Sequence, residues 1–182
     1  MKLIVLDRDG VINRDSADYI KSPREWYALP GSLEAIARLG QAGFSVVVAT
    51  NQAGIARGLF DYDDLFAIHD RMLQQVSDLG GRIDAIFFCP HGPHDGCECR
   101  KPAPGLLKQV ARRYSVSLDA VPFVGDSLRD LQAATAAGAR PVLVKTGNGR
   151  KTLAEQTDAV GRIEGLTVFD DLAAVAADLC GR

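Results

Sequence analysis

Two carboxylates lie at the end of an apolar run near the amino terminus, and their spacing suits metal or proton-transfer chemistry. Asp7 and Asp9 are separated by the single residue Arg8 and are followed by Gly10. The run Leu3 to Leu6 before them predicts a strand buried on both faces, as in a parallel sheet. Ligands of such sheets bind at the carboxyl ends of the strands. A turn that happens to contain acidic residues is the alternative.

Polar side chains follow several other apolar runs. Thr50 follows one run. Asp126 follows a second, and Lys101 lies downstream of a third. Because the carboxyl ends of parallel strands meet at one edge of a sheet, we expect these groups to converge with Asp7 in one crevice. The predicted strands are residues 3–6, 44–49, 85–88, 121–124, 140–144 and 166–169.

Segments with helical periodicity alternate with these strands. Glycines end several of the segments, as at Gly43 and Gly138. This alternation predicts an α/β fold, a doubly wound parallel sheet forming a single domain over residues 1–182. The polar segment from Arg14 to Pro30 has no sustained period and is predicted to be a loop or flap. The predicted helices are residues 32–43, 61–79, 104–114 and 128–137, a weaker one after 149, and one from 170 onward.

The composition is that of a globular protein with one hydrophobic core. Of the 182 residues, 47% are hydrophobic and 24% are charged, and 21 Lys and Arg nearly balance 23 Asp and Glu. This balance argues against a nucleic-acid surface. No apolar run reaches the length of a membrane span, and the amino-terminal run is too short for a signal peptide. We therefore expect a cytoplasmic monomer with neither nucleic-acid nor membrane partners.

Three of the four cysteines lie within eleven residues, which indicates metal binding rather than a disulfide framework. Cys89, Cys97 and Cys99, together with His91 or His94, match a Cys₃His tetrahedral zinc site. With all four positions filled by protein, the zinc would be structural and would order a loop rich in Gly and Pro. A cluster of free thiols is the alternative.

The motifs Asp7-x-Asp9-Gly, Thr50, Lys101 and Gly125-Asp126-Ser-x-x-Asp130 occur in the order typical of the haloacid dehalogenase (HAD) superfamily of phosphohydrolases, which the chain resembles. The resemblance implies that Asp7 attacks phosphorus and that Asp9 is the general acid and base. It also implies a Mg²⁺ site made by Asp7, Asp126 and the backbone carbonyl of Asp9. Thr50 and Lys101 would bind phosphoryl oxygens. Asp130 would bind the metal through water or orient its neighbours.

The intervals between these motifs are too short for a cap domain, so we expect an open crevice. Among capless members the chain resembles the bacterial D-glycero-D-manno-heptose 1,7-bisphosphate 7-phosphatases. The matching stretches include Thr50 to Gly58 and Cys97 to Pro102. The resemblance implies a small phosphorylated sugar as substrate, removal of its 7-phosphate, and a place in the supply of activated heptose for surface glycans. It also favours His91 over His94 as the zinc ligand.

A bisphosphate requires further polar contacts beyond the reacting phosphate. Arg57 and Arg100 are the main candidates for the second phosphate, and Lys145 is a weaker one. Asn51 is a further candidate for substrate binding. Each of these side chains could instead be a solvated surface group.

Two other functions compete with a heptose phosphatase. Histidinol-phosphate phosphatases share the zinc loop, so this loop cannot distinguish the two substrates. The stretch from Gly54 to Gly58 favours the sugar enzymes. A non-catalytic phosphosugar-binding protein is the second alternative, and the intact pair Asp7 and Asp9 opposes it. The anomer at carbon one is left open by the sequence.

Overall fold

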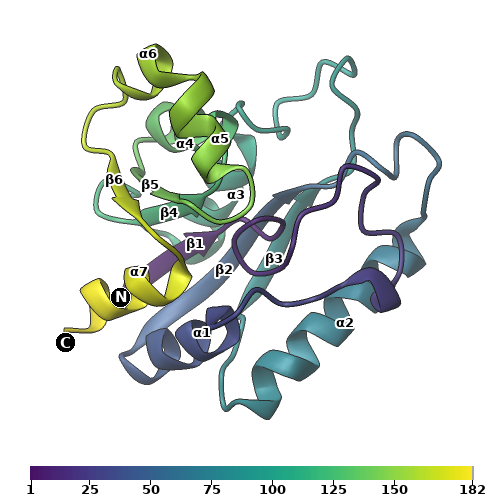
Figure 1. The fold of residues 1–182 in the computed structure, drawn as a ribbon, viewed down its shortest axis with the longest axis horizontal. Coiled ribbons are helices and arrows are strands. Elements are labelled where there is room, and N and C mark those ends of the chain that lie inside the picture. The colour runs from purple at the N-terminus through teal and green to yellow at the C-terminus, as the bar shows by residue number, and fades with distance from the viewer. Residues whose placement is uncertain (182) are drawn as a thin grey trace.

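A six-stranded parallel sheet lies at the centre of the computed structural model, which describes residues 1–181 (Figure 1). The strands are β1 (Lys2–Leu6), β2 (Phe44–Asn51), β3 (Ala85–Cys89), β4 (Pro122–Gly125), β5 (Arg140–Val144) and β6 (Thr167–Phe169). Their order is β3-β2-β1-β4-β5-β6. The chain proceeds outward from β1 to β3 and then returns to the other side of β1 with β4. The strand order therefore reverses between β1 and β4, which is where α/β proteins form ligand crevices.

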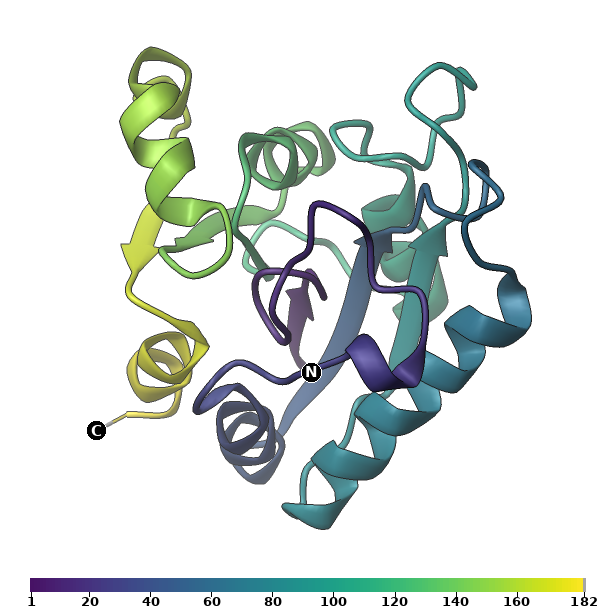
Figure 2. The ribbon, with the colours of Figure 1, turned by 45° about the vertical axis from the view of Figure 1, so that its right-hand side comes forward.

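Helices cover both faces of this sheet. Figures 1 and 2 show α1 and α2 on one side of β2 and α3 on the other. The hydrophobic core is correspondingly divided: one cluster joins the sheet to α1, α2 and α7, and another joins it to α3 and α4. The helices are α1 (Ser32–Gln41), α2 (Tyr62–Asp78), α3 (Gly105–Tyr114), α4 (Leu128–Ala137), α5 (Gly149–Glu155), α6 (Thr157–Val160) and α7 (Leu172–Cys180), with a 3-10 helix η1 (Pro23–Glu25).

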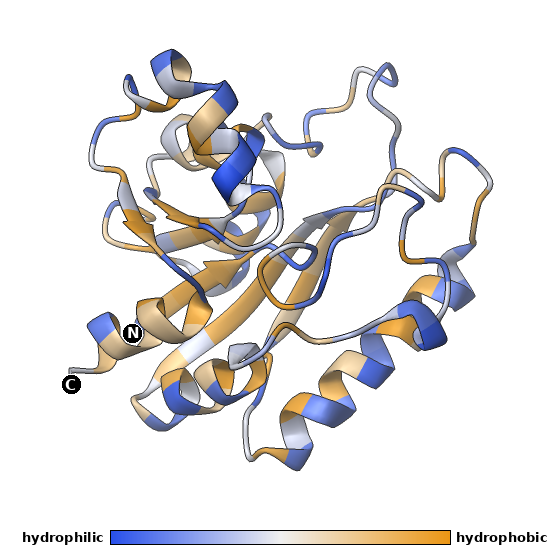
Figure 3. Cartoon of the chain, in the orientation of Figure 1, coloured by the Kyte–Doolittle hydropathy of each residue, from blue (hydrophilic) through white to orange (hydrophobic). Residues whose placement is uncertain are grey.

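The two-fold alternation of side chains along β1 explains the two clusters. Ile4 and Leu6 pack toward α1, whereas Leu3 and Val5 pack toward α3. All four are buried, which accounts for the continuous apolar run in the sequence. In Figure 3 the central strands are accordingly the most hydrophobic elements, while polar residues lie along the outer surfaces of the helices.

The predicted doubly wound parallel sheet is confirmed, and no inserted cap interrupts the described chain. One boundary differs in a way that matters for the site. Strand β2 continues through Thr50 and Asn51, because these residues pair with Phe88 and Cys89 of β3. The Thr50 side chain is therefore fixed by the sheet itself. The predicted flap, residues 14–30, contains η1 and is anchored by the fully buried Trp26.

Across residues 1–181, no helix combines the length and the apolar composition needed to cross a membrane.

Candidate active site

A cavity of about 240 Å³ lies at the carboxyl ends of β1, β2 and β4. Strand ends, the flap and the loop after β3 all contribute to it. Nearly every functional group expected from the sequence therefore lies around one crevice. The lining includes Asp7, Asp9, Asp15, Tyr19, Thr50, Asn51, Gln52, Arg100, Lys101, Asp126, Ser127, Arg129, Asp130 and Asn148.

Lys101 is clamped between two carboxylates at the floor of this cavity. Its Nζ lies 2.9 Å from Asp7 Oδ1 and 2.7 Å from Asp130 Oδ1, and it also donates to the carbonyl of Ala49 at 3.0 Å. Burial would lower the pKa of Lys101, but Asp130 and Asp7 outweigh this effect and raise it. Lys101 therefore carries a fixed positive charge beside Asp7.

Burial and neighbouring charges strongly perturb the pKa of Asp7. Burial raises its pKa well above the usual value, against the opposing pull of Lys101 and with a further rise from Asp130. Its Oδ1 also accepts the backbone N–H of Arg8 at 2.7 Å. Additional positive charge next to Asp7 would favour the ionised form that a nucleophile needs.

The protein backbone approaches the carboxylate of Asp126 closely. Its Oδ2 accepts the N–H of Asn148 at 2.7 Å. A Cβ at Gly10, which has φ +82°, would lie 2.0 Å from Asp126 Oδ2, and one at Gly147 would lie 2.2 Å from it. Burial and the neighbouring Asp130 raise the pKa of Asp126 to about 7. Two glycines are thus required for this carboxylate to reach the cavity.

Oxygen ligands from Asp7, Asp126 and Asp130 lie within 4.8 Å of one another. This donor set suits a hard divalent cation such as Mg²⁺, which would also relieve the repulsion among the three acids. Asp130 is already committed, because Oδ1 pairs with Lys101 and Oδ2 accepts from Ser127. Its contacts fit the orienting role better than the metal-binding one.

The carboxylate of Asp9 is saturated with hydrogen bonds. The fully buried Arg8 contacts both of its oxygens, at 2.9 and 3.1 Å. Asn13 Nδ2 donates to Oδ1 and Gln52 Nε2 donates to Oδ2, each at 2.9 Å. Burial alone would raise the pKa of Asp9, but the Arg8 guanidinium and these hydrogen bonds hold it below its usual value.

The residues at the end of β2 connect the acids to the loop that carries Lys101. Gln52 Nε2 donates to Thr50 Oγ1 at 3.0 Å as well as to Asp9. Asn51 exchanges two hydrogen bonds with the Lys101 backbone, at 3.0 and 3.1 Å. Asn51 lines the cavity, but its amide is occupied in holding this loop.

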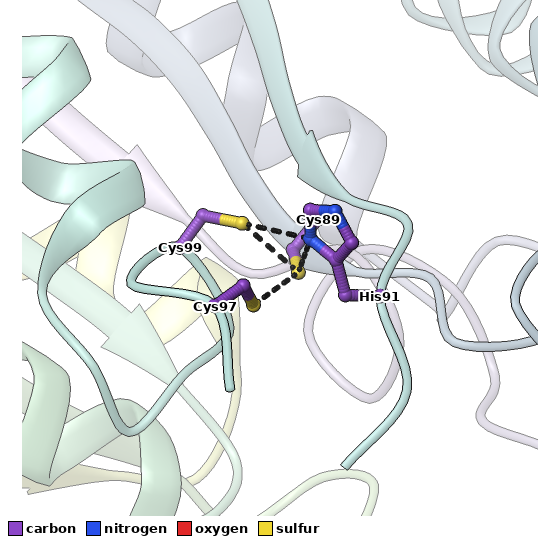
Figure 4. Close-up of side chains that lie close together, drawn as sticks. All are labelled: Cys89, His91, Cys97 and Cys99. Carbon is purple, nitrogen blue, oxygen red and sulfur yellow. Dashed lines mark hydrogen bonds between the residues drawn. The ribbon is translucent and has the colours of Figure 1, made fainter. Parts of the chain in front are cut away.

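The cysteine loop brings together the four expected zinc ligands. Cys89 Sγ contacts His91 Nδ1, Cys97 Sγ and Cys99 Sγ, and Cys99 Sγ also contacts His91 Nδ1, as the close-up in Figure 4 shows. His94 does not belong to this group. Four contacts between the ligand atoms measure 3.2 to 3.7 Å. A tetrahedral zinc with Zn–S bonds of about 2.3 Å would set its ligands roughly 3.7 Å apart. The donor set and spacing therefore fit zinc.

The cationic candidates for a second phosphate fall into two groups. Arg100 lines the cavity, and its Nη1 donates to the carbonyl of His91 at 3.3 Å. Arg57 lies outside the cavity lining, with its guanidinium 5.5 Å from the ring centre of Tyr19. Lys145 is also outside and pairs with Asp170 at 2.8 Å. Only Arg100 of the three borders the cavity directly.

The sequence provided only partial signals for several groups in and around the cavity. Arg8 lies between the two acids, where a charged side chain is usually solvated. His69 falls on the apolar face of α2, and Nε2 lies 3.3 Å from Arg8 Nη1. Asn148 follows β5 in a Gly-Asn-Gly sequence typical of a strand-end loop. Arg129 had no signal beyond its position three residues after Asp126.

Comparisons with known proteins agree with this geometry. Residues 98–175 match the HAD-hydrolase-like family. The chain is 64% identical over 179 residues to the D-glycero-beta-D-manno-heptose-1,7-bisphosphate 7-phosphatase of Bordetella bronchiseptica, covering 98% of each chain. It is 55% identical to the enzyme of the same name from Pseudomonas aeruginosa, covering 97% of each.

Solved structures give the same relatives. The D,D-heptose 1,7-bisphosphate phosphatase of B. bronchiseptica, complexed with magnesium and phosphate, aligns with a TM-score of 0.94 at 63% identity over 98% of each chain. The corresponding enzyme of Burkholderia thailandensis aligns with a TM-score of 0.77 at 51% identity over 100% of each chain. Magnesium is therefore present in a close structural relative.

Proposed function

The chain belongs to the D-glycero-beta-D-manno-heptose-1,7-bisphosphate 7-phosphatase family of HAD-like hydrolases, and we propose that it removes the 7-phosphate of the β anomer of this bisphosphate. It is a phosphomonoesterase. The single observation that carries the proposal is the buried Asp7 carboxylate, 2.9 Å from the Lys101 ammonium at the floor of the cavity. This pair provides an oxygen nucleophile and a cation that lets it approach an anionic phosphate.

In the first step, an Asp7 oxygen forms a bond to phosphorus while the bond from phosphorus to the carbon-7 oxygen breaks. The products are an aspartyl-phosphate and the sugar alkoxide, which takes a proton from Asp9. Lys101 and the Thr50 hydroxyl, both buried at the floor, bind the phosphoryl oxygens. Asp130 acts by holding Lys101 in place.

In the second step, Asp9 takes a proton from the water that attacks the aspartyl-phosphate, which releases phosphate and restores Asp7. The contacts from Arg8, Asn13 and Gln52 keep Asp9 ionised in the free enzyme, the form required for this base step. For the acid step Asp9 must carry a proton, and a phosphate dianion bound beside it favours protonation.

Two metals support this chemistry without changing the roles of the side chains. Mg²⁺, held by Asp7, Asp126 and the Asp9 carbonyl, supplies positive charge that offsets the charge on the transferring phosphoryl group. Zinc on Cys89, His91, Cys97 and Cys99 orders the loop that carries Arg100 and Lys101. The enzyme acts as a monomer.

The position of cleavage is the property that tests this function. The purified protein is given Mg²⁺ and the β-1,7-bisphosphate, and the remaining phosphate ester is followed by ³¹P NMR. We expect loss of the carbon-7 resonance and survival of the carbon-1 resonance. Preferred cleavage at carbon one, or a much higher kcat/KM for histidinol phosphate, would refute the substrate assignment but not the phosphatase chemistry.

A further inference from the structure

The flap, residues 14–30, borders the catalytic cavity with its first part. Across residues 1–181, the segment 15–19 forms one hydrogen bond to a part of the chain outside the flap: Asn148 Nδ2 donates to Asp15 Oδ2 at 2.7 Å. The position of this segment over the cavity therefore depends on Asn148. The flap residues that line the cavity are Asp15, Ser16, Ala17, Tyr19 and Ile20.

The side chain of Asn148 also reaches Asp126. Its Nδ2 lies 3.2 Å from Asp126 Oδ2, and the backbone N–H of Asn148 donates to the same oxygen at 2.7 Å. The amide nitrogen carries two hydrogens, so one is available for each of the two carboxylates. Within the described residues, Asp126 Oδ1 takes part in no hydrogen bond and is left free for a metal ion.

The loop that carries Asn148 is held in place on both sides of this residue. Thr146 Oγ1 donates to the carbonyl of Gly10 at 2.7 Å, and Thr152 Oγ1 donates to the carbonyl of Asp126 at 3.0 Å. Asn148 is thus a fixed point to which the flap is attached. Its amide lies between two carboxylates that would otherwise repel each other.

We propose that Asn148 is a positioning residue that couples the flap to the magnesium site, through one amide group shared by Asp15 and Asp126. This inference rests on the proposed function, because the mechanism makes Asp126 a Mg²⁺ ligand. The charge of Asp126 is partly offset when Mg²⁺ is bound, so its repulsion of Asp15 weakens and the flap is held more firmly. Coupling of this kind is reciprocal, so an attached flap in turn favours magnesium binding.

Hydrogen–deuterium exchange measures the attachment of the flap without turnover. The full-length protein is compared with and without saturating Mg²⁺, and peptides that contain residues 16–19 are followed by mass spectrometry. The N–H groups of Ser16, Asp18 and Tyr19 form hydrogen bonds within the flap, so their exchange reports its opening. We expect Mg²⁺ to slow this exchange about fivefold or more in the parent, and less than about twofold in Asn148→Ala. General destabilisation would instead accelerate exchange in α7 as well.

Further variants show whether the shared amide is the link. Asn148→Asp keeps the shape and the backbone N–H of this residue but replaces both side-chain hydrogens by a repelling oxygen, so it should also lose the effect of Mg²⁺. Gln41→Glu, which adds the same charge at an exposed position on α1, is the matched control and should keep the effect. Asp15→Ala should lose the effect, and Asp15→Ala combined with Asn148→Ala should lose no more than either change alone.

The outcomes separate this inference from the proposed function. A parent enzyme that hydrolyses the bisphosphate, with equal protection of the flap by Mg²⁺ in the parent and in Asn148→Ala, would overturn the coupling and leave the proposed function standing. Loss of protection in Gln41→Glu, or a greater loss in the double variant than in either single one, would also overturn the coupling. A parent that neither binds Mg²⁺ in calorimetry nor hydrolyses the bisphosphate would overturn the proposed function and this inference with it.

Discussion

The imidazole of His69 lies 3.3 Å from the guanidinium of Arg8, and both side chains are buried beneath the active site. Burial, reinforced by the positive charge of Arg8, lowers the pKa of His69 to about 3. The imidazole is therefore neutral and accepts a hydrogen bond from Arg8. Arg8 in turn holds the Asp9 carboxylate, so His69, a helix residue outside the cavity lining, supports Asp9 through one intermediary.

This arrangement predicts a pH dependence of stability. In the unfolded chain His69 has its ordinary pKa near 6.5, so between about pH 6.5 and 3 the unfolded state binds a proton that the folded state excludes. Stability is then lost as the pH falls through this range, and His69 contributes a loss of about 2 kcal/mol between pH 6.5 and 5. We expect urea unfolding of His69→Gln to show a correspondingly smaller difference between these pH values.

The control for this effect is His94→Gln, which alters an exposed histidine of the zinc loop. It should keep the parent's dependence on pH. An unchanged dependence in His69→Gln would mean that His69 is protonated in the folded protein and does not accept a hydrogen bond from Arg8.

The close approach of Gly10 to Asp126 predicts that Gly10→Ala weakens magnesium binding. The added methyl would displace the Asp126 carboxylate, so the Mg²⁺ concentration for half-maximal activity should rise about tenfold or more. Titration of phosphatase activity with Mg²⁺ measures this. Gly43→Ala is the matched control: its φ of +84° is similar, but a Cβ there meets nothing within 4 Å. Gly43→Ala should lose about 1 kcal/mol of stability because of its positive φ, and Gly10→Ala should lose more because its methyl also collides with Asp126. An equal magnesium shift in both variants would contradict the prediction.

Loss of the zinc site should impair substrate binding more than folding of the sheet. Cys99→Ser removes one ligand, and without zinc the loop no longer fixes Arg100 and Lys101. We expect about one zinc per chain in the parent, little in the variant, and a KM about tenfold higher. Metal analysis and steady-state kinetics measure these quantities. Cys180→Ser alters the cysteine outside the loop and should change neither; a Cys99→Ser variant with normal zinc content would rule out this ligand set.

Much of the site could be predicted because its acids follow strands directly. The hydrophobic pattern locates the strand ends, and parallel topology then brings Asp7 and Asp126 together at the reversal between β1 and β4. The clustering of Cys89, Cys97 and Cys99 was predictable for another reason, since close spacing of thiols is informative in sequence alone.

The features of the site that the sequence did not predict depend on tertiary contacts. In the sequence, Arg8 cannot be distinguished from a surface charge. In the fold it is fully buried and contacts His69 of α2. Arg57 and Arg100 were equivalent candidates in the sequence, and only the folded loops show that Arg57 stacks on Tyr19. The ion pair between Lys101 and Asp130 joins the cysteine loop to α4, and no local sequence pattern encodes it.

The role of Asp7 as nucleophile is tested most directly by trapping the phosphorylated enzyme. A single turnover with the β-1,7-bisphosphate and Mg²⁺ is quenched in acid, and the protein is digested and analysed by mass spectrometry. We predict a phosphoryl group on the peptide containing Asp7, sensitive to hydroxylamine, and none in Asp7→Asn, which should be folded and inactive. Steady turnover by Asp7→Asn at a rate comparable to the parent, with no phosphorylated peptide in either protein, would contradict the mechanism.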